Sequence, residues 1–174
     1  MINKLPEPDE HGFMSNIDKQ VVDEVTDGVL AGGAAGIEAV VGMFKGPGEG
    51  GDYKAHYALH CAVIAVGTGR EEERRMVAST LAKCVGRDLP KGVKAYLLQE
   101  LQAVGTAAEA EAIGAFLCDD ELCEPAAAAL MAIRRGARRQ FENALPNAAG
   151  KCKATIEQNL ALLQRRRGRR GAGG

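Results

Sequence analysis

The feature that most constrains this chain is one apolar pattern that recurs four times. Each copy places apolar residues at positions i, i+4, i+8 and i+11, which 3.6 residues per turn brings to one face of an α-helix. The four copies are Ala55, Leu59, Val63 and Val66; Val93, Leu97, Leu101 and Val104; Leu122, Ala126, Leu130 and Ile133; and Cys152, Ile156, Leu160 and Leu163. Successive copies are offset by 38, 29 and 30 residues, so the sequence predicts a helical repeat.

A second set of helical patterns lies between these copies. It comprises Met76, Val77 and Leu81; Ala110, Ile113 and Leu117; and Phe141 and Leu145. Two further helices are predicted upstream, from Ile17, Val21, Val22, Val25 and Val29, and from Ile37, Val40, Val41 and Phe44. The unit is therefore a helix–turn–helix with a period of about 30 to 40 residues. Because one unit cannot bury its stripe alone, neighbouring units are expected to stack around a shared core.

Residues typical of helix ends occur where these patterns begin and stop. Gly67 and Gly105 follow equivalent stripes, where we expect both to adopt the left-handed turn that ends many helices. Pro90 and Pro125 stand near the starts of helices, where a missing N–H costs least. Ser15 is a candidate N-cap for the first helix.

Two segments, "LQAVGTAAEAEAIGAFLCDDELCEPAAAALMAI" and "ALPNAAGKCKATIEQNLALL", resemble the HEAT repeats of bacterial proteins. The cadence "VGT…A…L…DDEL…A…AL.AI" is similar to a HEAT-repeat family of planctomycete-type bacteria, and the resemblance covers residues 52–165. It implies an all-α fold, an α–α superhelix or HEAT-like solenoid of about four to five helix pairs. It also implies a binding or scaffolding role and no catalytic residues, since HEAT motifs are packing motifs. "IRRGARRQ" departs from the apolar, proline-containing turn that such repeats often have.

The same patterns divide the chain into three parts. Residues 1–14 have no periodic pattern and are predicted to form a flexible N-terminal arm. Residues 15–164 form the HEAT-like helical repeat domain, interrupted by an irregular loop at the glycine-rich "KGPGEGGD", 45–52. Residues 165–174 form a flexible Arg/Gly-rich C-terminal tail.

The composition favours closely packed helices in a cytoplasmic protein. Aromatic residues make up only 4% of the chain, so Ala, Val, Leu and Ile must fill the core. Five scattered cysteines fit reduced thiols better than a disulfide framework. No apolar run approaches the roughly 20 residues that span a bilayer, and "MINKLPEPDEHG" lacks the apolar region of a secretory signal. We therefore expect no membrane contact.

"FLCDDELCEP", residues 116–125, combines cysteines with carboxylates and admits two interpretations. In the first it is the corner between two helices, because Leu117 ends one apolar pattern and Leu122 begins the next. Asp119 or Asp120 would then cap the helix that follows. In the second interpretation the segment binds a metal. We favour the corner.

The cysteines decide between those interpretations. In a corner, Cys118 and Cys123 pack as small apolar side chains. A structural zinc site would need two more ligands, which Cys84 or Cys152 could supply from an adjacent repeat. Cys152, however, occupies a stripe position, and free cysteine is commonly buried. We predict no metal and no other cofactor.

"HYALHC" places His56 and His60 four residues apart on one helix face, as in a two-histidine metal pair. The glutamate of an H-E-x-x-H motif is missing, which excludes a zinc protease of that type. HEAT-repeat di-iron hydroxylases resemble the predicted fold but rely on repeated His-Glu pairs, and here no histidine precedes a glutamate. Both histidines are predicted to be ordinary inter-repeat or surface residues.

Arginines gather in two places. The candidate contacts to a partner or to nucleic acid are Arg134, Arg135, Arg138, Arg139, Arg165, Arg166, Arg167, Arg169 and Arg170. The net charge is −1, and removing the five tail arginines leaves the rest of the chain at −6. An Arg/Gly tail resembles RNA-binding segments, but it has no interleaved aromatic residues, and the simpler interpretation is a solvated terminus.

These observations predict a non-catalytic module or scaffold that binds another protein on a curved helical surface. One alternative is a HEAT-like nucleic-acid-binding protein that uses the arginine tail and the patch Arg134–Arg139. A second alternative is a HEAT-like metal-dependent enzyme that uses His56, His60 or a cysteine.

Overall fold

The computed structural model describes residues 1–9, 17–46, 48–67 and 69–171, and of residues 166–171 it describes the backbone alone. This part of the chain forms helices joined by turns and loops and contains no β-strand, which confirms the predicted all-α class. The α-helices are α1 (Lys19–Ala31), α2 (Gly33–Val41), α3 (Tyr53–Val66), α4 (Glu71–Val85), α5 (Lys91–Val104), α6 (Ala110–Gly114), α7 (Cys123–Ile133), α8 (Ala137–Ala144) and α9 (Gly150–Gly171). Two short 3-10 helices are η1 (Ile2–Lys4) and η2 (Leu145–Asn147).

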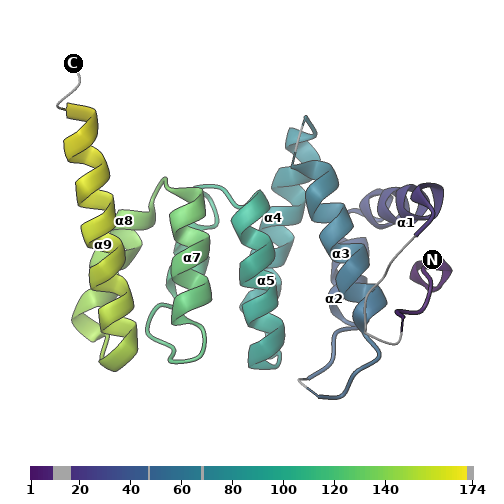
Figure 1. Cartoon of the computed structure of the whole chain (residues 1–174), viewed down its shortest axis with the longest axis horizontal. Helices are drawn as coiled ribbons and strands as arrows, with labels where there is room; N and C mark the ends of the chain where they lie inside the picture. The colour runs from purple at the N-terminus through teal and green to yellow at the C-terminus, as the bar shows by residue number, and fades with distance from the viewer. Residues whose placement is uncertain (10–16, 47, 68, 172–174) are drawn as a thin grey trace.

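The helices form two layers (Figure 1). In the front layer α3, α5, α7 and α9 stand side by side, and each packs against the next. Behind them, α2 packs against α4, α4 against α6, and α6 against α8. Helix α1 closes one end of the molecule against α2 and α3. At the other end α9 continues past the tops of its neighbours.

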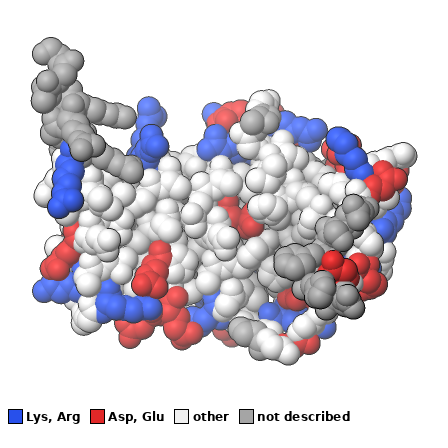
Figure 2. Space-filling model, viewed as in Figure 1, with Lys and Arg blue, Asp and Glu red and all other residues white. Residues whose placement is uncertain are grey.

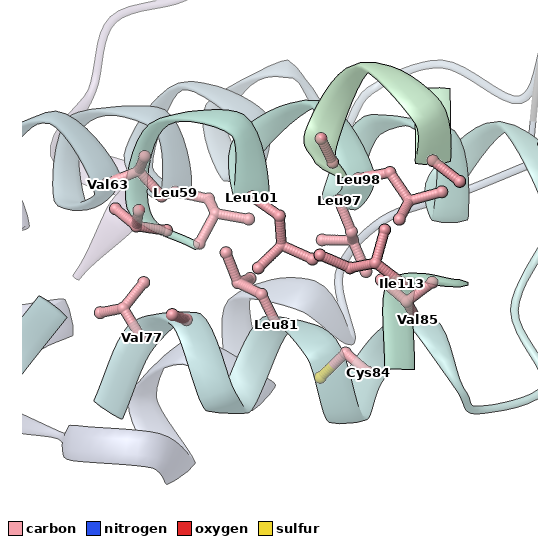
Figure 3. Close-up of a cluster of buried hydrophobic side chains, with 14 of the residues drawn as sticks. Leu59, Val63, Val77, Leu81, Cys84, Val85, Leu97, Leu98, Leu101 and Ile113 are labelled. Carbon is pink, nitrogen blue, oxygen red and sulfur yellow. The ribbon is translucent and has the colours of Figure 1, made fainter. Parts of the chain in front are cut away.

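The four stripes predicted from the sequence point between the two layers. All four stripe residues of α3 and all four of α5 are at most 3% exposed. Figure 3 shows the contact: Leu59 and Val63 of α3 and Leu97, Leu98 and Leu101 of α5 meet Val77, Leu81, Cys84 and Val85 of α4, with Ile113 of α6 beside them. In the last two copies Ile133, Leu160 and Leu163 are only partly buried. The predicted register is therefore confirmed, with burial declining toward the C-terminal end.

The predicted left-handed turns at Gly67 and Gly105 are wrong. Gly67 stays right-handed at φ −63°, and its N–H donates to the Ile64 carbonyl at 3.1 Å. Gly105 is extended, at φ −58° and ψ 150°. A Cβ at Gly105 would lie 2.5 Å from the Leu101 carbonyl oxygen and 2.8 Å from Cδ1 of Ile133. This glycine therefore permits a close approach between α5 and α7 and is not needed for a positive φ.

A left-handed backbone occurs instead in "IRRGARRQ", the segment that departs from the HEAT pattern. Arg134 has φ 66° and Gly136 has φ 82°, so the chain reverses between α7 and α8 without a proline. Pro90 and Pro125 do stand at helix starts, as predicted: Pro90 is the N-cap of α5, and Pro125 lies in the first turn of α7.

Part of the predicted flexible N-terminal arm is packed. Leu5 is 2% exposed and contacts Val25 of α1 and Ala58 of α3. Asp18 caps α1, since its carboxylate accepts from the Gln20 N–H at 2.9 Å. The predicted cap Ser15 lies outside the described residues. At the other terminus α9 runs to Gly171, so no helix end marks the predicted start of the tail at residue 165.

Candidate interaction surface

The outward side of α3, α5 and α7 is almost free of charge over most of their length. We define the front face as the outward surface of residues 57–66 of α3, 95–104 of α5 and 125–133 of α7. In these three segments Glu100 is the single Asp, Glu, Lys or Arg residue. The exposed residues of the face are neutral side chains and one histidine: His60, Ile64, Gln99, Gln102, Ala103, Ala128 and Ala132. Figure 2 shows the middle of this face as a mostly white area, with Lys and Arg gathered toward its edges.

Charges at the lower edge of the front face are largely paired with one another. Lys91 at the start of α5 forms an ion pair with Asp119. Lys151 of α9 approaches Glu124 of α7 at 3.6 Å, and Lys54 of α3 approaches Glu7 at 2.8 Å. Such exposed pairs contribute little to stability. The centre of the face lacks such charges apart from Glu100, so removing it from water costs less free energy than removing the edge.

Glu100 lies at the centre of this neutral face. Its side chain is 5% exposed, and both of its oxygens lie near Nδ1 of His60 on α3, at 3.1 and 3.2 Å. Because a carboxylate only accepts hydrogen bonds, Nδ1 of His60 carries the donated proton. The His60 side chain is itself 55% exposed. The pair therefore joins a buried acid to an imidazole at the surface.

Tyr96 lies one turn before Glu100 on α5. Its hydroxyl donates to the His56 carbonyl at 2.9 Å, which ties α5 to α3. Burial raises the pKa of Tyr96, and the nearby Glu100 carboxylate raises it further. Burial also raises the pKa of the neighbouring Cys61 thiol, so both groups stay protonated and neutral at physiological pH.

His56 belongs to a separate aromatic cluster. Its ring stacks on Phe44 with centroids 4.1 Å apart and meets Tyr96 edge-on at 4.3 Å. Nε2 of His56 lies 3.1 Å from a carboxylate oxygen of Asp52, which also accepts from the Lys45 N–H at 2.9 Å. Burial acts to raise the pKa of Asp52, but these two contacts hold it below its usual value. A pocket of about 370 Å³ opens beside the cluster.

His56 and His60 therefore face different carboxylates. They do not form the two-histidine pair that their spacing admits. Among the residues that the structure describes, no three His, Cys, Asp or Glu side chains come together as candidate metal ligands.

The segment 116–125 is a corner between α6 and α7. The Asp119 carboxylate accepts from the N–H groups of Glu121 and Leu122, at 3.0 and 3.3 Å, so Asp119 caps the turn that leads into α7, while the N-cap of α7 itself is Leu122, which makes no side-chain cap bond. Its ion pair with Lys91, helped by these N–H groups and opposed by burial, holds the pKa of Asp119 below its usual value. Cys123 is fully buried, as predicted, but Cys118 is exposed, because it sits on the outer side of the turn.

Cys152 does approach this corner. Its thiol donates to Oδ1 of Asp120 at 3.4 Å and lies against Cys123. Burial, followed by these two neighbours, raises the pKa of Cys152 to about 12. The contact joins the first turns of α7 and α9, and the prediction of Cys152 as a core residue is confirmed by its 1% exposure.

The predicted arginine contacts lie on one edge of the molecule. Arg134 and Arg135 are exposed in the turn between α7 and α8, and Arg139 is exposed on α8. That turn and the C-terminal end of α9 both lie at the upper edge in Figure 1. Arg138 is partly buried and pairs with Glu142 at 3.0 Å.

The arginines of the predicted tail continue along α9. Arg165 is exposed on this helix. Arg166, Arg167, Arg169 and Arg170 lie on its backbone, and their side chains are outside the described part.

Sequence reasoning missed Glu100 and Tyr96. Glu100 directly precedes the stripe residue Leu101, and most residues within one helical turn of it are apolar. This sequence context indicates an acid near the core. Its partner is 40 residues away on another helix, so the pairing itself left no local pattern.

Comparison with known proteins gives no identification: no protein-family model matches the chain, and no curated protein matches it. Within the described residues, none of the helices combines the length and hydrophobicity that crossing a membrane requires.

Proposed function

We propose that this protein is a non-catalytic interaction module with a HEAT-like α–α superhelix, and that it binds another protein on its front face. The observation that carries this proposal is the neutrality of the front face, whose three segments hold one charged residue, Glu100. The centres of protein interfaces are depleted of charged residues, because removing a charge from water is costly.

The shape of the face supports the same proposal. Ala103, Ala128 and Ala132 are exposed, and their short side chains let a partner's backbone approach the helices closely. Ile64 is 57% exposed and supplies apolar area beside them. A cytoplasmic location is part of the proposal, and the five free thiols support it.

Site-specific photo-crosslinking in cells tests this proposal. A photoreactive residue at Ala128, on the front face, is expected to give a discrete crosslinked product. The matched control is Lys83, which is exposed on α4 in the back layer. Ala128→Arg should weaken the complex, because it places a charge at the centre of the interface. Equal crosslinking from both positions would contradict an interface on the front face.

Nucleic-acid binding is the second candidate, and one observation favours it. Within the described residues, Arg134, Arg135 and Arg139 form no ion pair, although the remainder of the chain offers many carboxylates. Together with Arg165, which is exposed on α9, they give one edge of the molecule cations that can bind phosphate.

Fluorescence anisotropy with a labelled single-stranded RNA tests this candidate. Arg134→Gln with Arg135→Gln should weaken binding and lower the salt dependence by about one to two ions. The control is Arg75→Gln, since Arg75 is paired with Glu71. No observation gives similar support to the metal-dependent enzyme, because His56 and His60 bond to separate carboxylates.

A further inference from the structure

Glu100 is an acid in an unusual position. Glu38 pairs with Arg87 at 2.8 Å and Glu24 with Lys4 at 2.7 Å, while the buried Glu109 accepts hydrogen bonds from the N–H and hydroxyl of Thr106. Glu100 is far more buried than Glu38 or Glu24, yet the one ion-pair partner that the described residues give it is His60. A buried carboxylate without a permanent cation is costly to maintain.

Glu100 also has hydrogen-bonding capacity to spare. Two carboxylate oxygens provide about four acceptor sites. His60 offers a single N–H to both of them. Since the His60 side chain is 55% exposed, it can rotate into solvent and free the carboxylate for another donor.

The surroundings of Glu100 suit a cation. Tyr96, which is partly buried, lies one turn before Glu100 on α5 and interacts with its carboxylate. A tyrosine ring attracts a cation over its face, and the attraction strengthens when water is excluded. No Lys or Arg of the front face competes for this place.

We propose that Glu100 is the docking site for one cationic side chain, lysine or arginine, on a protein segment that lies across the front face. This inference rests on the proposed function and adds the chemistry of the partner. The segment is neutral where it meets Ala103, Ala128 and Ile64, and it carries one basic residue that displaces His60 and pairs with Glu100. A wholly apolar segment would bury the carboxylate without compensation, and an acidic segment would be repelled.

A display selection tests the inference with defined probes. Three helices packed about 8 to 10 Å apart are spanned by a helical peptide of about 16 residues, since each residue adds about 1.5 Å. Random peptides of this length are selected on the wild-type protein and counter-selected on Ala128→Arg, which keeps only binders of the front face. We expect the selected peptides to share one Lys or Arg at a fixed position.

Two independent substitutions then locate that basic residue. Replacing it with Met in the peptide should weaken binding to the wild-type protein at least about tenfold, since one partner of a buried charged pair is lost. Glu100→Gln should weaken binding similarly, while Glu157→Gln, at an exposed acid of α9, should leave it unchanged. The peptide substitution is measured on the wild-type protein, so its result does not depend on whether the Glu100→Gln variant folds.

The outcomes separate the two proposals. Peptides that bind the front face without a shared basic residue, or that bind Glu100→Gln as tightly as wild type, would overturn the role of Glu100 and leave the interaction face standing. If no peptide survives the counter-selection on Ala128→Arg, both the face and the Glu100 site are refuted.

Discussion

Helices α5 and α9 carry the same stripe but bury it to different degrees. In α5 all four stripe residues are at most 3% exposed, because the helix lies between α3 and α7 and in front of α4. In α9 the first two are buried, but Leu160 and Leu163 are only partly covered, since α9 has α7 and α8 on one side and no further helix of the described chain on the other. The apolar pattern determines which side of a helix is buried. The adjacent helices determine how completely that side is buried, and therefore how much it stabilises the fold.

The largest effect expected from this difference is at Leu101. Leu101→Ala should lower the free energy of unfolding by about 2 to 5 kcal/mol, because the side chain is fully buried and the cavity cannot collapse freely. Leu130→Ala, at the equivalent position of α7, should behave alike. Urea denaturation measures both. Leu160→Ala, at the equivalent stripe position of α9, should cost less, because Leu160 is only partly buried. Equal losses at Leu101 and Leu160 would contradict the difference between the two helices.

The glycines that end α3 and α5 offer a second contrast. Gly105→Ala should cost about 1 to 3 kcal/mol, because its methyl group would overlap the Leu101 carbonyl and Ile133. Gly67→Ala should cost less, since its Cβ would lie 3.2 Å from the nearest atom, the Ile64 carbonyl oxygen, against 2.5 Å at Gly105. Thermal melts of the two variants measure the difference. A stable Gly105→Ala protein would mean that α5 and α7 are not as close as described.

A smaller effect is expected at the corner between α6 and α7. Asp119→Ala should cost about 0.5 to 2 kcal/mol, the usual range for a lost N-terminal cap. Asp120→Ala should cost less, because its carboxylate meets a thiol and no backbone N–H. Chemical denaturation measures both, and the reverse order would assign the cap to Asp120.

The smallest effect is a pH dependence of that cap. The pKa of Asp119 is lowered by Lys91 in the folded protein, so its contribution is complete above the unfolded pKa of about 4. It is lost as the pH falls through the folded value. The stability gap between wild type and Asp119→Asn should therefore be constant near neutral pH and close in acid. A gap that widened in acid would contradict the ion pair.

Local patterns predicted the helices and their buried faces. The stripes of α3 and α5 could be identified because burial of Leu59 or Leu101 follows from a period of 3.6 residues within one helix. The choice between Asp119 and Asp120 could not be made, because it depends on which carboxylate turns toward the N–H groups of Glu121 and Leu122.

Features that depend on two helices could not be predicted from the sequence pattern of either helix alone. Gly105 was expected to have a positive φ, but its role comes from Ile133, 28 residues later. Cys118 was expected to pack, but the turn directs it outward. The pair of Glu100 and His60, on which the proposed docking site rests, joins residues that no single helical period relates.

The packing of each helix against those near it in the chain also has a kinetic consequence. Because α5 makes extensive contacts with both α4 and α7, its neighbours along the chain in the core, little loop-closure entropy opposes their first association. Folding is then expected to nucleate in this middle group and to spread outward one helix at a time. Unfolding begins at α9, whose amide hydrogens should exchange with solvent earlier than those of α5.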